Sequence, residues 1–475
     1  MESNSPKEGT AMTDTLLIYP YFQPAHDRSV FRFPPLGLGY IASYLRMHGV
    51  SVEIVDCTFI GEDEALRHVK ENKPSVIGIY SMYTMEENSL RFARRLRKEC
   101  DTLVAGGPLP TISPEKFLQD FDLVAIGEGE QTMLEIVNAF KAGDDFSKIN
   151  GITYKKTSMN GLQQSDSNEK NSVTFNPQRQ FISDLDSIPF PARDLFQNNR
   201  YIAYHKKVFG DATTSLMTSR GCPFNCDFCS KPVFGDTTRM RSPGNVVDEI
   251  EDIISYGYDC IFFQDDCFTL DEQRVTRICE EILDRGLGIR WRCLSRVDSV
   301  QHETLLKMKK AGCERIFFGI ESGNDSVLKI MNKQFTTDQA RAAVESVAST
   351  GIETGAFFIL GYPGETDQTV LDTVSFAASL PLDYASFTMP YPIPGTGLYE
   401  KVRKSAKDPM YTVPKSRLID HSLNFESNFS ETKLKFAILK AAAQIRMRKH
   451  LPNTAYTIIG KPFEALTYLV FKALK

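Results

Sequence analysis

Three cysteines stand close together near the middle of the chain, in the run Cys222-Pro-Phe-Asn-Cys226-Asp-Phe-Cys229. This C-x3-C-x2-C spacing lets three thiolates of one loop converge on a single iron-sulfur cluster. A four-iron cluster held by three cysteines keeps one iron free for another ligand. The alternatives are a zinc loop or three reduced thiols, but structural zinc normally has four protein ligands, and no second Cys/His pair follows this run.

The other cysteines show no repeated ligand spacing along the chain. We expect them to be buried thiols in a reducing cytoplasm, rather than disulfides or a second cluster. They are Cys57, Cys100, Cys260, Cys267, Cys279, Cys293 and Cys313.

Length and charge limit the classes of protein that need to be considered. The chain has 475 residues, more than one hydrophobic core usually supports, so two domains and a tail are expected. A net charge of -5 argues against a nucleic acid partner held by bulk electrostatics. The polar first residues lack the apolar core of a secretory signal, and no long uncharged apolar run predicts a spanning helix. We therefore expect a cytoplasmic protein.

Residues 15–141 alternate short apolar runs with helical patterns, which predicts a flavodoxin-like, doubly wound parallel sheet. The predicted strands are residues 16–19, 52–55, 76–80, 103–105 and 123–126. Ligands of such folds bind beyond the carboxyl ends of the strands, where glycine allows a cofactor to approach the backbone closely. The residues at these ends are Ser81, Gly106, Gly107, Gly127, Glu128 and Gly129.

A polar, proline-braced connector is expected over residues 142–205, with an exposed hairpin or insert at 155–176. Six further strand-like runs within residues 206–400 predict a partial (β/α)6 barrel, with its chemistry at the carboxyl ends of the strands. These runs are residues 216–219, 260–263, 289–292, 315–318, 356–359 and 384–387. Residues 401–475 are predicted to form a helical extension.

The cysteine run, with Phe228 just before its third cysteine, resembles the cluster loop of radical S-adenosylmethionine (SAM) enzymes. The resemblance implies that SAM chelates the free iron and is cleaved to a 5'-deoxyadenosyl radical, with Phe228 near the adenine. A SAM site also needs an acceptor for the amino group, a cation for the carboxylate, an acceptor for the ribose hydroxyls and an apolar slot.

Candidates for these roles follow successive predicted strands, which places them at one end of the barrel. They are Asp265 or Asp266 for the amino group, Arg296 for the carboxylate, Glu321 for the ribose, and the backbone around Gly361 for the adenine. For each of these side chains the alternative is a structural ion pair or a helix cap at a strand end.

The helix start at Pro34-Pro35-Leu36-Gly37, the Gly-Gly-Pro turn at 106–108 and the Gly-Glu-Gly-Glu loop at 127–130 resemble the cobalamin-binding domain that precedes many radical SAM domains. The D-x-H-x-x-G motif, which supplies a histidine to cobalt in other cobalamin proteins, is absent, because Asp56 has no histidine two residues on. His26, His48 and His68 are expected at the surface, although His26, near the end of the first strand, could approach the corrin. Cobalamin without a histidine ligand, or a domain that binds no corrin, are the two alternatives.

Together these resemblances imply an anaerobic, cobalamin-dependent radical SAM methyltransferase that acts on an unactivated carbon and uses two SAM molecules per turnover. One alternative is a radical SAM enzyme that catalyses cyclisation, hydroxylation or carbon-carbon coupling on a lipid or tetrapyrrole. Another is a cobalamin or redox sensor. The substrate would be a small molecule, a lipid or a protein side chain, and a ferredoxin or flavodoxin would supply electrons.

The tail contains a basic helical pattern at 433–450 and an apolar stripe at 463–474. Two interpretations of this pattern are open. The helices either cap the open barrel or make a peripheral contact with a membrane or a lipid substrate.

Overall fold

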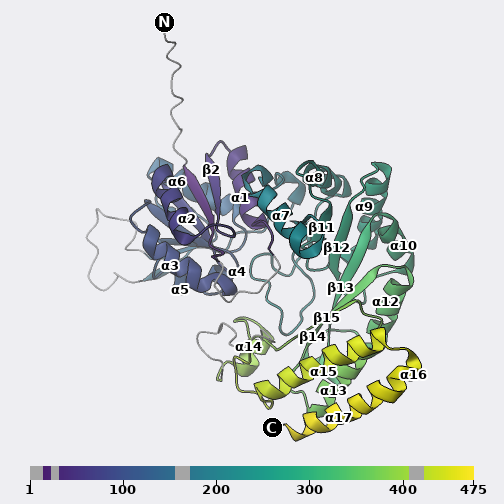
Figure 1. Ribbon diagram of the computed structural model, residues 1–475. Coiled ribbons are helices and arrows are strands. Elements are labelled where there is room, and N and C mark those ends of the chain that lie inside the picture. Colours follow the sequence, from purple (N-terminus) through teal and green to yellow (C-terminus); the bar gives the residue numbers. More distant parts are fainter. Residues whose placement is uncertain (1–13, 23–31, 156–171, 406–421, 475) are drawn as a thin grey trace. The chain divides into compact units, whose positions relative to one another are not determined.

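The computed structural model describes residues 14–22, 32–155, 172–405 and 422–474 (Figure 1). The chain divides after Gly210 into two compact units, and the short segment Pro232–Phe234 belongs to the first of them. Both units are built from α/β layers.

The sheet of the first unit has the strand order β2-β1-β3-β4-β5-β6-β7. Its first five strands are parallel, and β6 and β7 add an antiparallel edge. The strands are β1 Thr15–Tyr19, β2 Val52–Asp56, β3 Val76–Tyr80, β4 Thr102–Gly106, β5 Leu123–Ala125, β6 Ile152–Lys155 and β7 Val173–Phe175. The order 2-1-3-4-5 confirms the flavodoxin-like prediction. The described parts of the predicted connector, residues 142–155 and 172–205, belong to this first unit, whereas most of the insert predicted at 155–176 lies outside the described residues.

Helices cover both faces of this sheet (Figure 1). Leu16 and Ile18 belong to one apolar core and Leu17 to the other, because successive side chains of a strand point to opposite faces. Helices α2 to α5 contribute to the first core, and α1 and α6 to the second. The helices are α1 Leu36–Met47, α2 Glu62–Asn72, α3 Glu86–Leu96, α4 Pro108–Ile112, α5 Pro114–Phe117, α6 Glu130–Ala142 and α7 Asn198–Phe209, with short turns η1 Tyr83–Met85, η2 Phe146–Lys148, η4 Leu185–Ser187 and η5 Arg193–Leu195.

The second unit contains a parallel sheet in the order β8-β11-β12-β13-β14-β15. Strands that follow one another in this way, with a helix after most of them, form the predicted partial barrel. The strands are β8 Thr213–Leu216, β11 Cys260–Phe263, β12 Arg290–Ser295, β13 Cys313–Glu321, β14 Glu353–Ile359 and β15 Tyr384–Thr388. The two short strands β9 Ser219–Arg220 and β10 Arg239–Met240 pair separately and flank the cysteine run.

The helices of this unit pack outside the barrel or form the tail (Figure 1). The barrel helices are α8 Pro243–Ser255, α9 Glu272–Asp284, α10 His302–Lys310, α11 Asp325–Ile330, α12 Thr337–Ser349, α13 Asp367–Ser379 and α14 Gly397–Val402, with the turn η6 Phe268–Leu270. The tail helices are α15 Glu431–His450, α16 Asn453–Ala455, η7 Tyr456–Gly460 and α17 Lys461–Ala473.

The first barrel strand lies three residues earlier than predicted, at 213–216 instead of 216–219. Its residues Thr213, Thr214 and Ser215 are buried although they are polar. The Thr213 hydroxyl donates to the carboxylate of Asp211, which shows how such a strand satisfies its polar groups.

Tail helix α15 packs along α13. Its buried residues are three small or apolar ones, Leu434, Ala437 and Ala441, and three polar or charged ones, Lys433, Lys440 and Gln444. A Cβ atom on Gly361 would lie 2.4 Å from Leu434 of this helix, so the two segments are in close contact. Lys433 is paired with Asp367 at the start of α13 at 2.9 Å. Across the ranges described above, no helix is both long and apolar enough to cross a bilayer.

Candidate active site

The cysteine run forms the loop between β9 and β10, next to the carboxyl end of β8. Its cysteines, Cys222, Cys226 and Cys229, are free thiols. Burial, followed by the neighbouring thiols and the carboxylate of Asp266, raises the pKa of Cys229 to about 12. A donor set that is this unfavourable as bare thiolates fits a cationic metal centre, because bound iron would offset the crowded negative charge.

The side chain of Asp227, between the second and third cysteines, holds this loop in place. Its Oδ2 atom accepts a 2.5 Å hydrogen bond from the Tyr362 hydroxyl and lies 2.7 Å from the Lys401 Nζ atom. The Asp227 backbone N–H donates to the Met331 carbonyl, and its carbonyl accepts from the Leu398 N–H, both at 2.9 Å. Each of these partners comes from another element of the same unit.

Carbonyl oxygens on the other side of the loop are also occupied. The Lys231 ammonium donates to the carbonyls of Cys222 at 2.8 Å and Phe224 at 3.0 Å. The side-chain amide of Asn332 donates to the Asn225 carbonyl at 2.6 Å. The loop backbone is therefore fixed without using the thiols, which stay available for metal.

Arg296, predicted to hold the SAM carboxylate, lies against this same loop. Its guanidinium stacks 3.6 Å from the centre of the Phe224 ring, and its Nη1 atom lies 3.8 Å from the Cys226 sulfur. The Nε and Nη2 atoms both donate to Asp298, and Nη2 also donates to the Lys333 carbonyl at 2.7 Å. Most of the N–H groups of the Arg296 guanidinium therefore donate to other groups of the protein.

The two adjacent aspartates after β11 occupy different environments. Asp265 is buried, and its carboxylate accepts from the Thr218 N–H and hydroxyl and from the Ser219 hydroxyl at 2.5–2.6 Å. Asp266 is exposed to solvent and lies close enough to Cys222 and Cys229 to raise their pKa values. Of the two carboxylates, that of Asp266 is therefore the more accessible to a ligand.

Glu321, at the end of β13, meets a cation that the sequence pattern does not reveal. The Nζ atom of the buried Lys333 lies 3.4 Å from Glu321 Oε1 and 5.7 Å from the centre of the Phe228 ring. Glu321 has a φ of 72°, a backbone conformation that is uncommon for a non-glycine residue and is often found at functional sites. Phe228 also packs edge-on against Tyr362, with the ring centres 6.4 Å apart.

Sequence reasoning missed Lys333 because it does not follow a predicted strand. Its neighbours Asn332 and Gln334 both have a positive φ, of 56° and 60°. This turn brings Lys333 back toward the carboxyl end of β13, and no apolar periodicity marks such a turn. Sequence reasoning placed Tyr362 in the predicted loop after the fifth barrel strand but missed its contact with Asp227, because the two residues lie far apart in the sequence.

The loop after β14 contains Gly361, predicted to line the adenine, at a φ of 91°. The carboxylate of Glu365 accepts from the N–H groups of Gly361 and Tyr362 at 2.7 and 2.8 Å. Burial raises the pKa of Glu365 to about 7, against the lowering effect of these two hydrogen bonds. The buried Glu365 carboxylate therefore holds the backbone of this loop in place.

In the first unit, the predicted glycines lie at the carboxyl ends of β4 and β5. The Thr111 hydroxyl donates to the Gly107 carbonyl at 2.9 Å and accepts from the Gly127 N–H at 3.1 Å, which links the two loops. Gly107 has a φ of 108°, and a Cβ atom there would lie 2.7 Å from the Ser81 carbonyl oxygen. Gly106 ends β4, and a Cβ atom there would meet nothing closer than 4.0 Å.

Three of the predicted residues have contacts that stabilise the fold. The hydroxyl of buried Ser81 pairs with that of Ser89 at 2.8 Å. Glu128 accepts from the Ile182 N–H at 2.8 Å, and a Cβ atom on Gly129 would meet Ile41 at 2.7 Å. The open backbone of Gly106 and the neighbouring loop fit the close approach of a large planar cofactor.

The histidines of this unit that the structure describes are engaged elsewhere. His48 lies near the Tyr44 carbonyl beyond α1, and His68 lies 3.0 Å from Glu53. The ring of His205 contacts the Arg32 carbonyl at 2.5 Å. His26 lies outside the described residues. Asp56, where the missing histidine motif would start, accepts from the Tyr201 hydroxyl at 2.6 Å.

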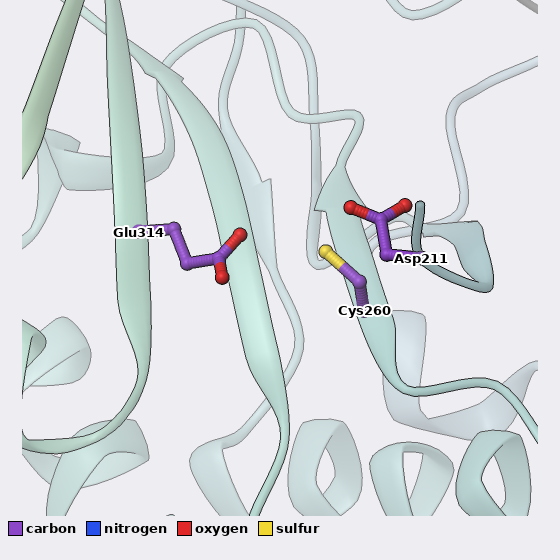
Figure 2. A group of neighbouring side chains, drawn as sticks. All are labelled: Asp211, Cys260 and Glu314. Atoms are coloured by element: carbon purple, nitrogen blue, oxygen red, sulfur yellow. The ribbon is translucent and has the colours of Figure 1, made fainter. Parts of the chain in front are cut away.

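A second group of potential ligands, Asp211, Cys260 and Glu314, is shown in Figure 2. Their ligand atoms lie within 4.8 Å of one another. The guanidinium of Arg292, however, pairs with Asp211 and lies 3.1 Å from Glu314, so a cation already sits between the carboxylates. The group lies at the starts of β8, β11 and β13, the end of a barrel that serves stability rather than chemistry. We interpret it as an ion-pair network.

The fold and the braced three-thiol loop define the class of a radical SAM protein with an N-terminal cofactor domain. Comparison with known proteins agrees with this class. Residues 216–377 match the Radical SAM superfamily, and residues 26–137 match the B12 binding domain. The chain therefore belongs to the cobalamin-binding radical SAM family.

Relatives match most of the chain. An uncharacterized methyltransferase from Pyrococcus horikoshii is 35% identical over 402 residues, which cover 81% of this chain and 82% of that protein. The anaerobic magnesium-protoporphyrin IX monomethyl ester cyclase of Rubrivivax gelatinosus is 30% identical over 405 residues, covering 82% and 69%. The solved structure of the cobalamin-dependent SAM radical enzyme OxsB, with aqua-cobalamin and SAM bound, has a TM-score of 0.74 at 18% identity and covers 96% of this chain and 72% of that one.

These matches confirm the predicted family, the enzyme class, and the three predicted cofactors, which are a four-iron cluster, SAM and cobalamin. They do not test the individual SAM and cobalamin contacts, which stay predictions.

We expect Gly397→Ala to weaken metal binding by the loop. A Cβ atom on Gly397 would lie 2.1 Å from Asp227 Oδ1, and Tyr362 and Lys401 hold that carboxylate in place. The overlap should cost about 1–3 kcal/mol and shift Asp227, so iron bound after anaerobic reconstitution should fall several-fold. Gly244→Ala is the matched control, because it is also at a helix start and its nearest neighbour lies 3.7 Å away. Equal iron content in the two variants would contradict this role of Gly397.

Glu365→Gln should remove a pH dependence from the stability of the second unit. The folded pKa of Glu365, about 7, lies above its ordinary value of 4.5, so its contribution to stability is present at low pH and is lost as pH rises through 7. Glutamine keeps an acceptor for the two N–H groups but does not titrate. The variant should gain on the order of 3 kcal/mol relative to the parent between pH 4.5 and pH 8. Parallel melting curves across this range would argue against a buried, titrating carboxylate.

Proposed function

We propose that this chain is a cobalamin-dependent radical SAM methyltransferase that acts on an unactivated carbon. The observation that carries the proposal is the set of free thiols in a braced loop, beside polar strand ends, in a chain that also has a B12 binding domain. The methyltransferase relative supports it, because the match covers 82% of that protein.

Each part of the chain has a separate task in this proposal. When bound, the cluster with SAM supplies a 5'-deoxyadenosyl radical that removes hydrogen, and cobalamin supplies the methyl group. Cys222, Cys226 and Cys229 hold the cluster, and Asp227 fixes the loop that carries them. The glycine-bearing ends of β4 and β5 hold the corrin.

Contacts to SAM are assigned from the environment of each side chain. Asp266 is the proposed acceptor for the amino group, since the buried Asp265 carboxylate already accepts three hydrogen bonds. Lys333 and the remaining Nη1 hydrogen of Arg296 are proposed for the carboxylate, because both are buried cations beside the loop. Glu321 would accept from the ribose hydroxyls.

The proposed adenine slot lies between an aromatic ring and a backbone segment. Phe228 provides the ring, and the backbone of the loop at Gly361, whose N–H groups at Gly361 and Tyr362 are held by Glu365, provides the other wall. Leu434 and Glu365 both contact this loop, so it is preorganised before any ligand binds.

A cyclase that keeps the radical step and omits methyl transfer is the second candidate. The cyclase relative, at 30% identity, favours it. The two functions can be distinguished by a product of SAM, which can be measured without knowing the substrate. A methyltransferase converts SAM to S-adenosylhomocysteine when it loads a methyl group, whereas the cyclase does not.

The proposal includes partners and a location. A ferredoxin or flavodoxin would supply the electron that reduces the cluster, and the methyl acceptor would be a small molecule, a lipid or a protein side chain. We place the enzyme in the cytoplasm, because reduced thiols and an oxygen-sensitive cluster need a reducing compartment.

Cys226→Ala provides the main test of the enzyme assignment. The reconstituted parent, given SAM and dithionite without oxygen, should form 5'-deoxyadenosine and about one S-adenosylhomocysteine per bound corrin. The variant should form no 5'-deoxyadenosine, because the cluster loses one of its three protein ligands. Cys279→Ala is the control, since this buried thiol lies in α9, outside the cluster loop, and its removal should leave both products unchanged.

Two outcomes would contradict parts of the proposal. Full 5'-deoxyadenosine formation by Cys226→Ala, with iron content as in the parent, would rule out the cluster assignment. Corrin and 5'-deoxyadenosine without S-adenosylhomocysteine would favour the cyclase.

We also expect bound cobalamin to have no protein histidine on the lower face of cobalt. His48, His68 and His205 have other contacts, and Asp56 is held by Tyr201. The electron paramagnetic resonance spectrum of the bound cob(II)alamin should therefore lack nitrogen superhyperfine splitting. A splitting that is present in the parent and lost in His26→Ala would identify a histidine ligand and overturn this prediction.

A further inference from the structure

The last helix, α17, exposes an apolar face to solvent. Leu466 and Leu469 are 62% and 66% exposed, and Val470 is 38% exposed. Residues three and four apart lie on the same side of a helix, so these side chains form one stripe. Phe471, on the opposite side, is fully buried. The helix is therefore already anchored to its own unit, and a second apolar face remains uncovered.

The stripe continues into the preceding turn, η7. Ile458 and Ile459 are 74% and 56% exposed, the first being the most exposed of the large apolar side chains in the described part of the chain. Single exposed leucines are ordinary on a protein surface, but five branched aliphatic residues in one continuous stripe are characteristic of an interaction surface.

Positive charge surrounds this stripe. The tail helices, residues 431–474, contain eight Lys and Arg residues and two Glu residues, a local charge of +6 in a chain whose net charge is -5. Several of these cations pair with carboxylates of the same unit, including Lys433 with Asp367 and Lys449 with Asp383. Lys461 and Lys472 are exposed, although Lys472 also lies 4.0 Å from Asp367, and the two lysines lie on one flank of α17 because eleven residues correspond to about three turns.

The geometry points to an anionic lipid bilayer as the partner of this surface. A second copy of the chain fits less well, because joining two such stripes would bring like charges together. The 13 residues of α17 span about 20 Å, too short to cross a bilayer, so the helix would lie in the plane of the interface. We propose that α17 and η7 attach the enzyme peripherally to anionic membranes, with the stripe among the acyl chains and the lysines at the headgroups.

Attachment through this surface does not depend on methyl transfer. Figure 1 shows α15 and α17 as an antiparallel pair, in which α15 is the helix that packs on α13. The lipid-binding face is therefore carried by the outer helix of the pair. It can be altered without touching the cluster loop or the Leu434 contact with Gly361.

Sedimentation of the full-length reconstituted enzyme with vesicles tests the proposal. The parent should bind vesicles that contain phosphatidylglycerol and phosphatidylcholine, bind pure phosphatidylcholine more weakly, and lose much of the difference in high salt. Leu466→Gln/Leu469→Gln should lower the partition coefficient about tenfold or more, because two large apolar side chains no longer enter the acyl region. The variant should still cleave SAM to 5'-deoxyadenosine.

The matched control is Leu283→Gln/Leu306→Gln, which removes two leucines of 45% and 43% exposure from α9 and α10. It should bind vesicles as the parent does. Equal losses in the two double variants, or no binding of the folded parent to either vesicle, would overturn the proposal. A parent that is dimeric in size-exclusion chromatography, fails to bind vesicles and becomes monomeric in Leu466→Gln/Leu469→Gln would show that a second copy covers the stripe.

Discussion

The hydrogen-bonded carboxylate of Asp227 is the interaction on which the rest of the site depends. A loop that must present three thiolates to one cluster loses its function if its backbone is not held in one conformation. Fixing the backbone of such a loop costs about 1–2 kcal/mol of conformational entropy per residue. The contacts of Asp227 with Tyr362, Lys401 and the backbone of Leu398 offset this loss of entropy. These partners come from the segments that follow β14 and β15, the last strands of the barrel, so the loop is ordered only when the barrel is complete.

Polar residues at the strand ends divide into those that support the loops and those that remain free to bind. Asp265, Arg296 and Glu365 direct most of their hydrogen-bonding capacity at the protein itself. Asp266 and the Glu321–Lys333 pair have fewer protein partners. The sequence shows that all of them except Lys333 follow predicted strands, but it cannot separate the two groups, because the partners that occupy a carboxylate lie up to dozens of residues away and meet it only in the fold.

Most strands could be predicted because both faces of each sheet are covered. Such strands are continuous apolar runs, so β3 and β11 begin and end where the sequence predicts. β8 could not be found in this way, because it is polar and buries Thr and Ser beside Asp211. The turn that brings Lys333 into the site depends on positive φ angles at Asn332 and Gln334, and no residue pattern predicts these angles.

The two ends of the barrel show why residue type alone does not identify a site. Asp211, Cys260 and Glu314 offer good metal ligands, yet they lie where the strands begin, and Arg292 already neutralises them. The thiols of Cys222 and Cys229 lie beyond the end of β8, with their backbone fixed by Lys231 and Asp227, and the one cation close to a sulfur of the described loop is Arg296, whose Nη1 atom lies 3.8 Å from Cys226. A set of ligand residues becomes a binding site when the protein holds their backbone in place but leaves the charge of the ligand atoms largely unneutralised. Of these two groups, only the cysteine loop meets that condition.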